Sequence, residues 1–179
     1  MKKAQIAFEQ DKLDIAENTY ISAIRLDQKN NEAYKGLIDV YLKQDQLKEA
    51  KETCQFLLQI HPDDDTAHVR MAEIADKMGD KHIAISSLKK AIEINDALAE
   101  RHFLLSIHLQ DEGEIKEALA AAVRTVDREP DNPRYLDNMI ELAIMVGDKK
   151  LSERSYDQLR LVNPQNSKLE SFKQKISAL

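Results

Sequence analysis

The sequence predicts an all-α protein built as an array of stacked helical repeats, because three residue types recur every 34 positions. A small residue occupies the first series, at Ala16, Ala50, Ala84, Ala118 and Ser152. Proline occupies the second series, at Pro62, Pro130 and Pro164, with Asp96 at the position where proline is missing. Glycine occupies the third, at Gly79, Gly113 and Gly147, with Asp11 and Asp45 at the two earlier positions. A fixed period of this length is typical of repeat arrays.

Composition narrows the classes of function. Hydrophobic residues make up 42% of the 179 residues and charged residues 32%, and the four glycines and four prolines leave no flexible linker or low-complexity segment. The formal net charge is −6, and Lys and Arg form no cluster beyond adjacent pairs, which argues against nucleic-acid binding. The single cysteine excludes an intrachain disulfide.

The N-terminal part gives expectations about location and completeness. No run of 18 apolar residues is present, so we expect no direct membrane insertion by this segment. The first ten residues lack the apolar core of a signal peptide, which favours a cytoplasmic location. Residues 1–30 form a partial repeat that starts at its fifth position, with helices expected at about 2–10 and 13–26. Two explanations stay open: a fragment of a longer protein, with a membrane tether upstream in some cases, or a natural start with a shortened first helix.

Residues 31–64 show the plan of a full repeat. The first helix is expected at about 32–44, with an apolar face formed by Tyr34, Leu37, Ile38 and Tyr41. The second is expected at about 47–60, with an inner face formed by Leu47, Ala50, Cys54, Leu57 and Leu58. Pro62 ends it, because proline disfavours helical geometry in the residue before it. Three more full repeats are expected, at 65–98, 99–132 and 133–166.

Local signals predict several helix ends. Gly79 is expected to close a helix in the left-handed conformation. Where proline is missing from its series, Asn95 or Asp96 is expected to cap the next helix. Asn132 is expected as an N-cap, with Pro133 in the first helical position.

Residues 167–179 are expected to form a C-terminal capping helix that covers the last repeat. Ser167 and Glu170 fit a capping box at its start. Its apolar stripe is expected to consist of Leu169, Phe172, Ile176 and Leu179.

The pattern Tyr34-x-x-Leu37-Ile38-x-x-Tyr41, followed by Ala50, Cys54, Leu57 and Pro62, resembles the tetratricopeptide repeat (TPR). The resemblance covers essentially the whole chain, as a single array of residues 1–179. Departures from the family pattern are Ile38 for glycine, Cys54 for a large aromatic, His68 and His102 for the leading aromatic, and Ser152 for alanine. The resemblance implies a right-handed α-solenoid, a superhelix of antiparallel helix pairs whose first helices line a concave groove. It also implies binding of proteins or peptides without catalysis, although a fold alone does not establish function.

In this family, six positions on the first helix of each repeat line the groove, so the resemblance implies a set of candidate binding residues. The principal candidates are Lys35, Asp39, Val69, Arg70, Glu73, Phe103, Leu104, Ile107, Arg134, Asn138 and Glu141. The same positions also contain Leu42, Lys43, Lys77, Gln110 and Met145. Because the set carries both signs of charge, we expect a partner of mixed charge.

One TPR subfamily binds the C-terminal carboxylate of chaperones through Lys, Asn and Arg side chains on successive repeats. Lys35 matches the first lysine, but Asp39 and Arg70 stand where asparagines are needed. Glu100 and Leu104 occupy the last two positions. Since an acidic residue beside a carboxylate disfavours its charged form, the sequence argues against this clamp.

The first helix of the fourth repeat is apolar on two faces, both of which must be buried. Phe103, Leu104 and Ile107 lie on or beside the groove face. One interpretation is an apolar anchor for a partner's helix or extended segment. The other is that these side chains pack against neighbouring helices of the array.

No motif indicates catalysis, a cofactor or a metal. The histidines form no zinc-binding pair at helical spacing, and His68 and His102 are expected to pack between helices. Cys54 is expected to be a buried core thiol. The acidic run at 63–65 lies at a helix junction, where it favours the helix dipole, and lacks the alternating ligands of a calcium loop.

The sequence therefore predicts a non-enzymatic protein-interaction scaffold that binds a peptide or helix in the concave groove. One alternative is a self-associating module, in which the shortened first helix leaves the face of the helix at 13–26 open to a second copy. Another is the targeting domain of a longer protein. The partner, the pathway and the organism are not indicated by any residue.

Overall fold

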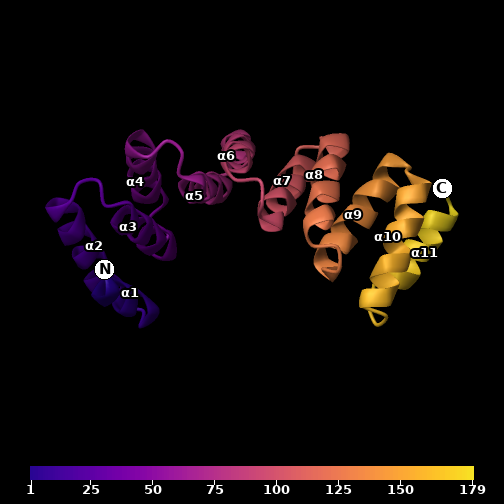
Figure 1. Ribbon diagram of the computed structural model, residues 1–179, viewed down its shortest axis with the longest axis horizontal. Helices are drawn as coiled ribbons and strands as arrows, with labels where there is room; N and C mark the ends of the chain where they lie inside the picture. The colour runs from indigo at the N-terminus through magenta and orange to yellow at the C-terminus, as the bar shows by residue number, and fades with distance from the viewer. The chain divides into compact units, whose positions relative to one another are not determined.

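The computed structural model describes residues 1–179 and contains eleven α-helices and no strands (Figure 1). This confirms the all-α prediction. The helices are α1 (Lys2–Glu9), α2 (Leu13–Leu26), α3 (Asn31–Lys43), α4 (Leu47–Ile60), α5 (Asp65–Lys77), α6 (Lys81–Ile94), α7 (Ala99–Asp111), α8 (Ile115–Arg128), α9 (Pro133–Val146), α10 (Lys149–Val162) and α11 (Leu169–Ser177). The chain divides into two compact units, residues 1–94 and residues 95–179. We refer to them as unit 1 and unit 2.

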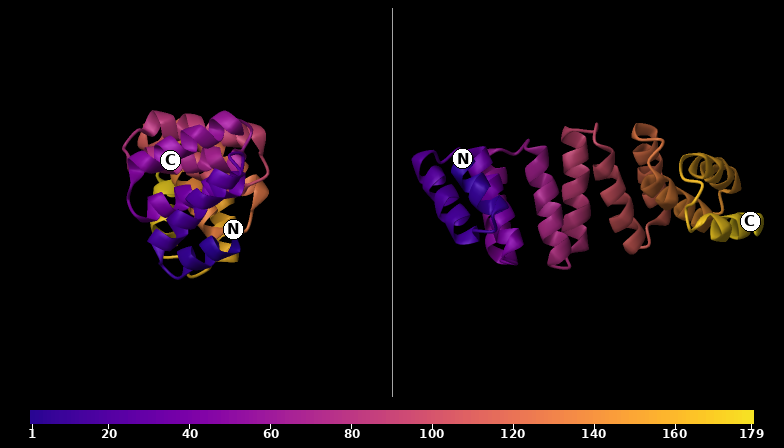
Figure 2. Two further views of the ribbon diagram at one scale, coloured as in Figure 1. Left: turned by 90° about the vertical axis from the view of Figure 1, so that its left-hand side faces the viewer. Right: turned by 90° about the horizontal axis from the view of Figure 1, so that it is seen from below.

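Within each unit, consecutive helices pack side by side, as the right-hand view of Figure 2 shows. α3, α5, α7 and α9 begin at residues 31, 65, 99 and 133, so the helices follow the 34-residue period of the sequence. The series of small residues lies at the helix contacts, and all five members have fully buried side chains: Ala16, Ala50, Ala84, Ala118 and Ser152. A small buried residue at the same point of each repeat lets the paired helices approach closely.

Two adjoining clusters form much of the core of unit 1. One joins α1, α2 and α3 around Ala16 and Tyr20, and the other joins α3, α4 and α5 around Ile38, Cys54 and Leu57. Gly36 on α3 lies directly against the Tyr20 ring of α2, since a Cβ atom added there would be 2.2 Å from Cζ of Tyr20. The absence of a side chain at Gly36 therefore leaves room for the Tyr20 ring.

The turns between paired helices contain one residue with a positive φ angle. Gly79, Gly113 and Gly147 adopt φ values of +78°, +79° and +81°, and Asp11 and Asp45 adopt 60° and 58° at the equivalent points. The left-handed conformation predicted for Gly79 is confirmed. Aspartate tolerates this region better than most residues, because its short polar side chain forms local hydrogen bonds.

Two predicted caps are wrong. The N-cap of α7 is Leu98 without a side-chain hydrogen bond, because Asn95 and Asp96 lie too far upstream and bond elsewhere. The N-cap of α11 is Lys168, also without a side-chain cap, so Ser167 and Glu170 form no capping box. The cap of α9 is as predicted: the Asn132 side chain accepts from the backbone N–H of Arg134, and Pro133 is the first helical residue.

α11 packs against α9 and α10 at the end of unit 2. Phe172 and Ile176 are buried and Leu169 is half-buried, as the apolar stripe predicts. Leu179 is 45% exposed and lies beyond the last helical residue, so it is not part of the packed stripe.

Candidate functional site

A cavity of about 320 Å³ lies on one face of unit 1, between α1, α3 and α5. Its lining side chains are Phe8, Asp39, Leu42, Lys43, Arg70, Glu73 and Lys77. On α5 the lining residues are spaced by three and four positions, and those on α3 lie within one turn, so each helix contributes one stripe. The apolar stripes of the same helices turn toward the core, where Ile38 and Ile74 are fully buried. The polar stripes are therefore left to line this cavity, which we call the α1–α3–α5 cavity.

Arg70 links α3 and α5 across the cavity. Its Nε lies 2.7 Å from Oδ1 of Asp39, and its Nη1 lies 3.3 Å from Oε2 of Glu73. Burial raises the pKa of the Asp39 carboxyl above its ordinary value, and the nearby Arg70 guanidinium partly opposes this. Each of the three charges thus has a partner within the protein.

The two lysines that line the cavity differ in their partners. Lys43 Nζ lies 2.7 Å from Oδ1 of Asp11 and 5.0 Å from the centre of the Phe8 ring. The Lys77 side chain is exposed and forms no hydrogen bond or ion pair. Lys77 is therefore the one cation of this cavity whose charge is not balanced by a neighbouring carboxylate.

Two predicted site residues of unit 1 lie outside this cavity. Lys35 lines a second cavity of about 390 Å³ at the α4–α5 turn, and its Nζ lies 2.9 Å from Oδ2 of Asp64. Burial raises the pKa of Asp64, but hydrogen bonds from Thr66, Asn31, Lys35 and a backbone N–H outweigh it and hold the pKa well below its usual range. Val69 is half-buried on α5 and does not line either cavity.

In unit 2, Phe103 is only 7% exposed and packs against helix α9. The Phe103 ring centre lies 5.2 Å from that of Tyr135. The Arg134 guanidinium carbon lies over the Phe103 ring, 4.0 Å from its centre. Glu100 receives a 2.7 Å hydrogen bond from the Tyr135 hydroxyl and lies 3.3 Å from Arg134 Nη1. Burial, with this bond to Glu100, raises the pKa of Tyr135 to about 12. Phe103 therefore packs between helices rather than presenting an open apolar surface.

The remaining candidate site residues of unit 2 are of two kinds: side chains already paired within the protein, and apolar side chains that are accessible. Asn138 is buried and accepts a 2.7 Å hydrogen bond from Ser106, and Glu141 lies 2.9 Å from Nζ of Lys168. Leu104 and Ile107 are half-buried on α7, and Met145 on α9 is 55% exposed. Among the residues at the predicted groove positions of unit 2, accessible apolar surface thus comes from these three side chains.

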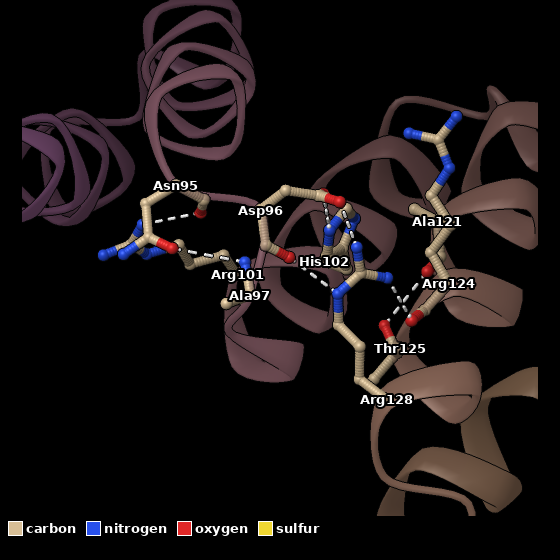
Figure 3. A network of polar contacts seen from close by, with 9 residues as sticks. All are labelled: Asn95, Asp96, Ala97, Arg101, His102, Ala121, Arg124, Thr125 and Arg128. Atoms are coloured by element: carbon tan, nitrogen blue, oxygen red, sulfur yellow. Dashed lines mark hydrogen bonds and ion pairs between the residues drawn. The ribbon is translucent and has the colours of Figure 1, made fainter.

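A polar network replaces the missing proline at the start of unit 2 (Figure 3). Asp96 Oδ1 lies 2.7 Å from Nε2 of His102, and its other carboxylate oxygen pairs with Nη2 of Arg128. Arg128 Nε also donates to the Asp96 carbonyl at 2.6 Å, and Arg101 Nη1 donates to the Asn95 carbonyl at 2.9 Å. The network fastens the segment before α7 to α7 and α8, which is a structural role.

Phe8 is the lining residue that the prediction missed. It occupies the same repeat position as Leu42, 34 residues earlier. Carrying the groove positions back into the partial first repeat identifies it, so the signal was present in the sequence.

No group of three or more His, Cys, Asp or Glu side chains is placed to hold a metal ion. No helix has the length and apolar character needed to cross a membrane. Cys54 is fully buried, its Sγ lies 3.3 Å from the Ala67 carbonyl oxygen, and burial raises the pKa of its thiol to about 12. This thiol is therefore part of the buried core of unit 1.

Several solved structures share this fold at low sequence identity. YrrB, described as a TPR protein with an unusual peptide-binding site, is 21% identical with a TM-score of 0.77, over 96% of this chain and 88% of that one. MamA from Desulfovibrio magneticus RS-1 is 14% identical with a TM-score of 0.77, over 92% and 93%. Pseudomonas aeruginosa PilF is 17% identical with a TM-score of 0.77, over 96% and 78%. At these identities the likeness shows the fold alone.

Sequence comparison identifies the family. No curated protein sequence matches the chain. Two profiles described as tetratricopeptide repeat match residues 7–68 and 65–97, and so together span about half of the chain. With the repeat period of the helices and the fold shared with solved TPR proteins, these matches show that the chain belongs to the tetratricopeptide repeat family.

Proposed function

We propose that the chain is a protein-interaction scaffold that binds a peptide or helix of a partner protein along α1, α3 and α5. Membership of the TPR family supports a protein-interaction scaffold in general, and proteins of this family are generally not enzymes. The observation that carries the finer proposal is the α1–α3–α5 cavity, which combines half-buried Phe8 and Leu42 with charged side chains of both signs. A concave mixed surface of this kind suits a peptide segment better than a small apolar ligand.

On α7 and α9 of unit 2, Leu104, Ile107 and Met145 are proposed as apolar contacts for a partner. Accessible apolar side chains beside polar ones are common where proteins bind one another. Phe103 is not one of these contacts, since its ring is covered by Arg134 and Tyr135.

The proposal is tested by site-specific photo-crosslinking in extracts of the source cells. A photoreactive residue is placed at Leu42, which lines the cavity, and in a control at Phe56, which is 48% exposed on α4. A discrete adduct at position 42 that is absent at position 56 supports the proposal. Adducts at position 56 alone, or at neither position, contradict it.

Self-association is a second candidate, favoured by exposed apolar side chains near the N-terminus. Ile6 on α1 is 52% exposed and Ile15 on α2 is 49% exposed. Burial of both against a second copy removes apolar area from water and favours a dimer. The expected result is a molar mass that rises with concentration in light scattering and stays monomeric in an Ile6→Lys, Ile15→Lys variant. A monomer throughout the concentration range contradicts this candidate.

A further inference from the structure

We infer that the α1–α3–α5 cavity binds an acidic side chain of the partner segment at Lys77, beside an apolar side chain seated on Phe8 and Leu42. The inference rests on the proposed function and adds the chemistry of the bound segment. It follows from which charges around the cavity already have partners and which do not.

The carboxylates of the cavity are already paired. Asp39 accepts from Arg70 through both Nε and Nη2, at 2.7 and 3.3 Å, and Glu73 lies 3.3 Å from Arg70 Nη1. A cationic ligand group would have to displace Arg70 from Asp39 or Glu73. The Asp39 carboxylate is half-buried. Removing one partner from such a pair leaves the other charge desolvated, which is costly. The cavity therefore disfavours a basic side chain at this point.

The cations of the cavity are paired except for one. Arg70 is held by two carboxylates and Lys43 by Asp11, whereas Lys77 forms no ion pair. Glu73 and Lys77 lie four residues apart on α5, the spacing that suits a Glu–Lys pair on a helix. Glu73 nevertheless pairs with Arg70, which leaves the Lys77 ammonium available to an incoming carboxylate.

The apolar part of the cavity lies on the neighbouring helices. Phe8 on α1 and Leu42 on α3 are half-buried, and the Lys43 ammonium lies 5.0 Å from the Phe8 ring centre. An aliphatic or aromatic side chain seated there removes apolar area from water and supplies binding energy. The carboxylate at Lys77 then fixes the register of the segment, since charge pairs contribute more to specificity than to affinity.

The test uses a displayed library of random peptides as the probe. It is selected in parallel against the wild type, a Lys77→Glu variant and a Lys48→Glu control. Lys48 is also exposed and unpaired but lies on α4, so its reversal makes the same change of charge away from the cavity. Circular dichroism and thermal melting confirm that each variant is folded. Leu42→Asp marks which selected peptides bind in the cavity.

The expected outcome is a wild-type consensus with Asp or Glu at a fixed distance from an apolar residue. These peptides lose about tenfold or more in affinity for Lys77→Glu, where the new carboxylate repels the acid, and keep their affinity for Lys48→Glu. The Lys77→Glu selection returns Lys or Arg at the same consensus position. Binding of the acidic peptides selected on the wild type to the wild type itself weakens as salt concentration rises, because exposed ion pairs are screened by salt.

The failures of the two proposals differ. Peptides that are lost with Leu42→Asp but carry no conserved acid, or bind Lys77→Glu as well as the wild type, overturn the inference and leave the proposed function standing. A wild-type selection that yields no peptide sensitive to Leu42→Asp overturns the proposed function, and the inference with it.

Discussion

At the residue scale, positions without a conspicuous motif determine the packing of unit 1. Gly36 is a helical glycine, and in an exposed helix alanine at such a position is more favourable by about 1 kcal/mol. Here the side chain would enter the ring of Tyr20, which is 2% exposed and whose hydroxyl lies 3.2 Å from Oε1 of Gln5. Because the Tyr20 ring is buried and cannot move aside into solvent, helix propensity favours alanine at position 36 while packing disfavours it.

We expect packing to dominate, so that Gly36→Ala lowers the free energy of unfolding by about 1–3 kcal/mol, the usual cost of an overpacked core. Urea denaturation measures this change. In a Tyr20→Ala background the same substitution should be neutral or stabilising, because the ring is gone. Equal destabilisation in both backgrounds would contradict the contact as the cause.

Cys54 gives a second test at this scale. Its thiol is fully buried, and burial, together with the nearby Asp64 carboxylate, raises its pKa to about 12. Since the thiolate is the reactive form, we expect no reaction with a thiol reagent at pH 8 in the native protein and one thiol per chain in denaturant. Rapid stoichiometric labelling of the native protein would contradict the burial of Cys54.

At the element scale, the junction before α7 depends on a network rather than on proline. His102 is 1% exposed, and its pKa is lowered by burial and by Arg128, although Asp96 acts in the opposite direction. The folded state therefore binds a proton at His102 less readily than the unfolded state does. Stability is complete above the unfolded value near 6.5 and falls as the pH drops from there through the folded pKa.

We therefore expect the free energy of unfolding to decrease between pH 7 and pH 5, and to decrease less in His102→Gln. The Asp96 pKa is lowered too, mainly by its hydrogen bond to His102, but its contribution is lost only below about pH 4, the ordinary range of a carboxyl. Urea denaturation at pH 7, 6 and 5 on both proteins separates His102 from other titrating groups. Parallel curves for the two proteins would show that His102 does not account for the pH dependence.

The helix bounds and caps show which features of the fold can be predicted from the sequence. Helices α2 and α4 begin and end at the residues that periodicity predicts, because their apolar spacing and flanking turn residues agree. The predicted cap of α7 is wrong, because a polar residue near a helix start also bonds to tertiary partners that are absent from the local sequence. Asp96 is the clearest case, since His102 and Arg128 lie on two different helices. The predicted capping box of α11 is wrong because the helix begins after Lys168, and Glu170 accepts a hydrogen bond from Gln174 of the same helix.

The candidate site could be predicted only in part, for a related reason. Repeat positions identify the face, and Asp39, Arg70 and Glu73 do line one cavity. They do not reveal that Phe103 is covered by Arg134, or that Lys35 is held by Asp64 in a separate cavity. Side-chain pairing between successive repeats decides which groups remain accessible, and this is a property of the packed helices.

At the scale of the whole molecule, the two units offer different chemistry on equivalent helices. In unit 1, α3 and α5 carry ion pairs and one free lysine around a cavity. In unit 2, α7 and α9 carry accessible Leu104, Ile107 and Met145. A repeated backbone plan thus supports unlike surfaces, because the residues that pack the helices and those that face outward occupy different positions in the period.

The most direct test of the central claim is the dissociation constant of the partner crosslinked at position 42, measured by calorimetry for the wild type, Leu42→Asp and Phe56→Asp. Each variant is first checked for an unchanged melting transition. If the α1–α3–α5 cavity is the binding site, Leu42→Asp weakens binding about tenfold or more, the usual cost of disrupting a central contact, and Phe56→Asp leaves it unchanged. Equal affinity of Leu42→Asp and the wild type, or loss with Phe56→Asp alone, would contradict the claim and place recognition on another face.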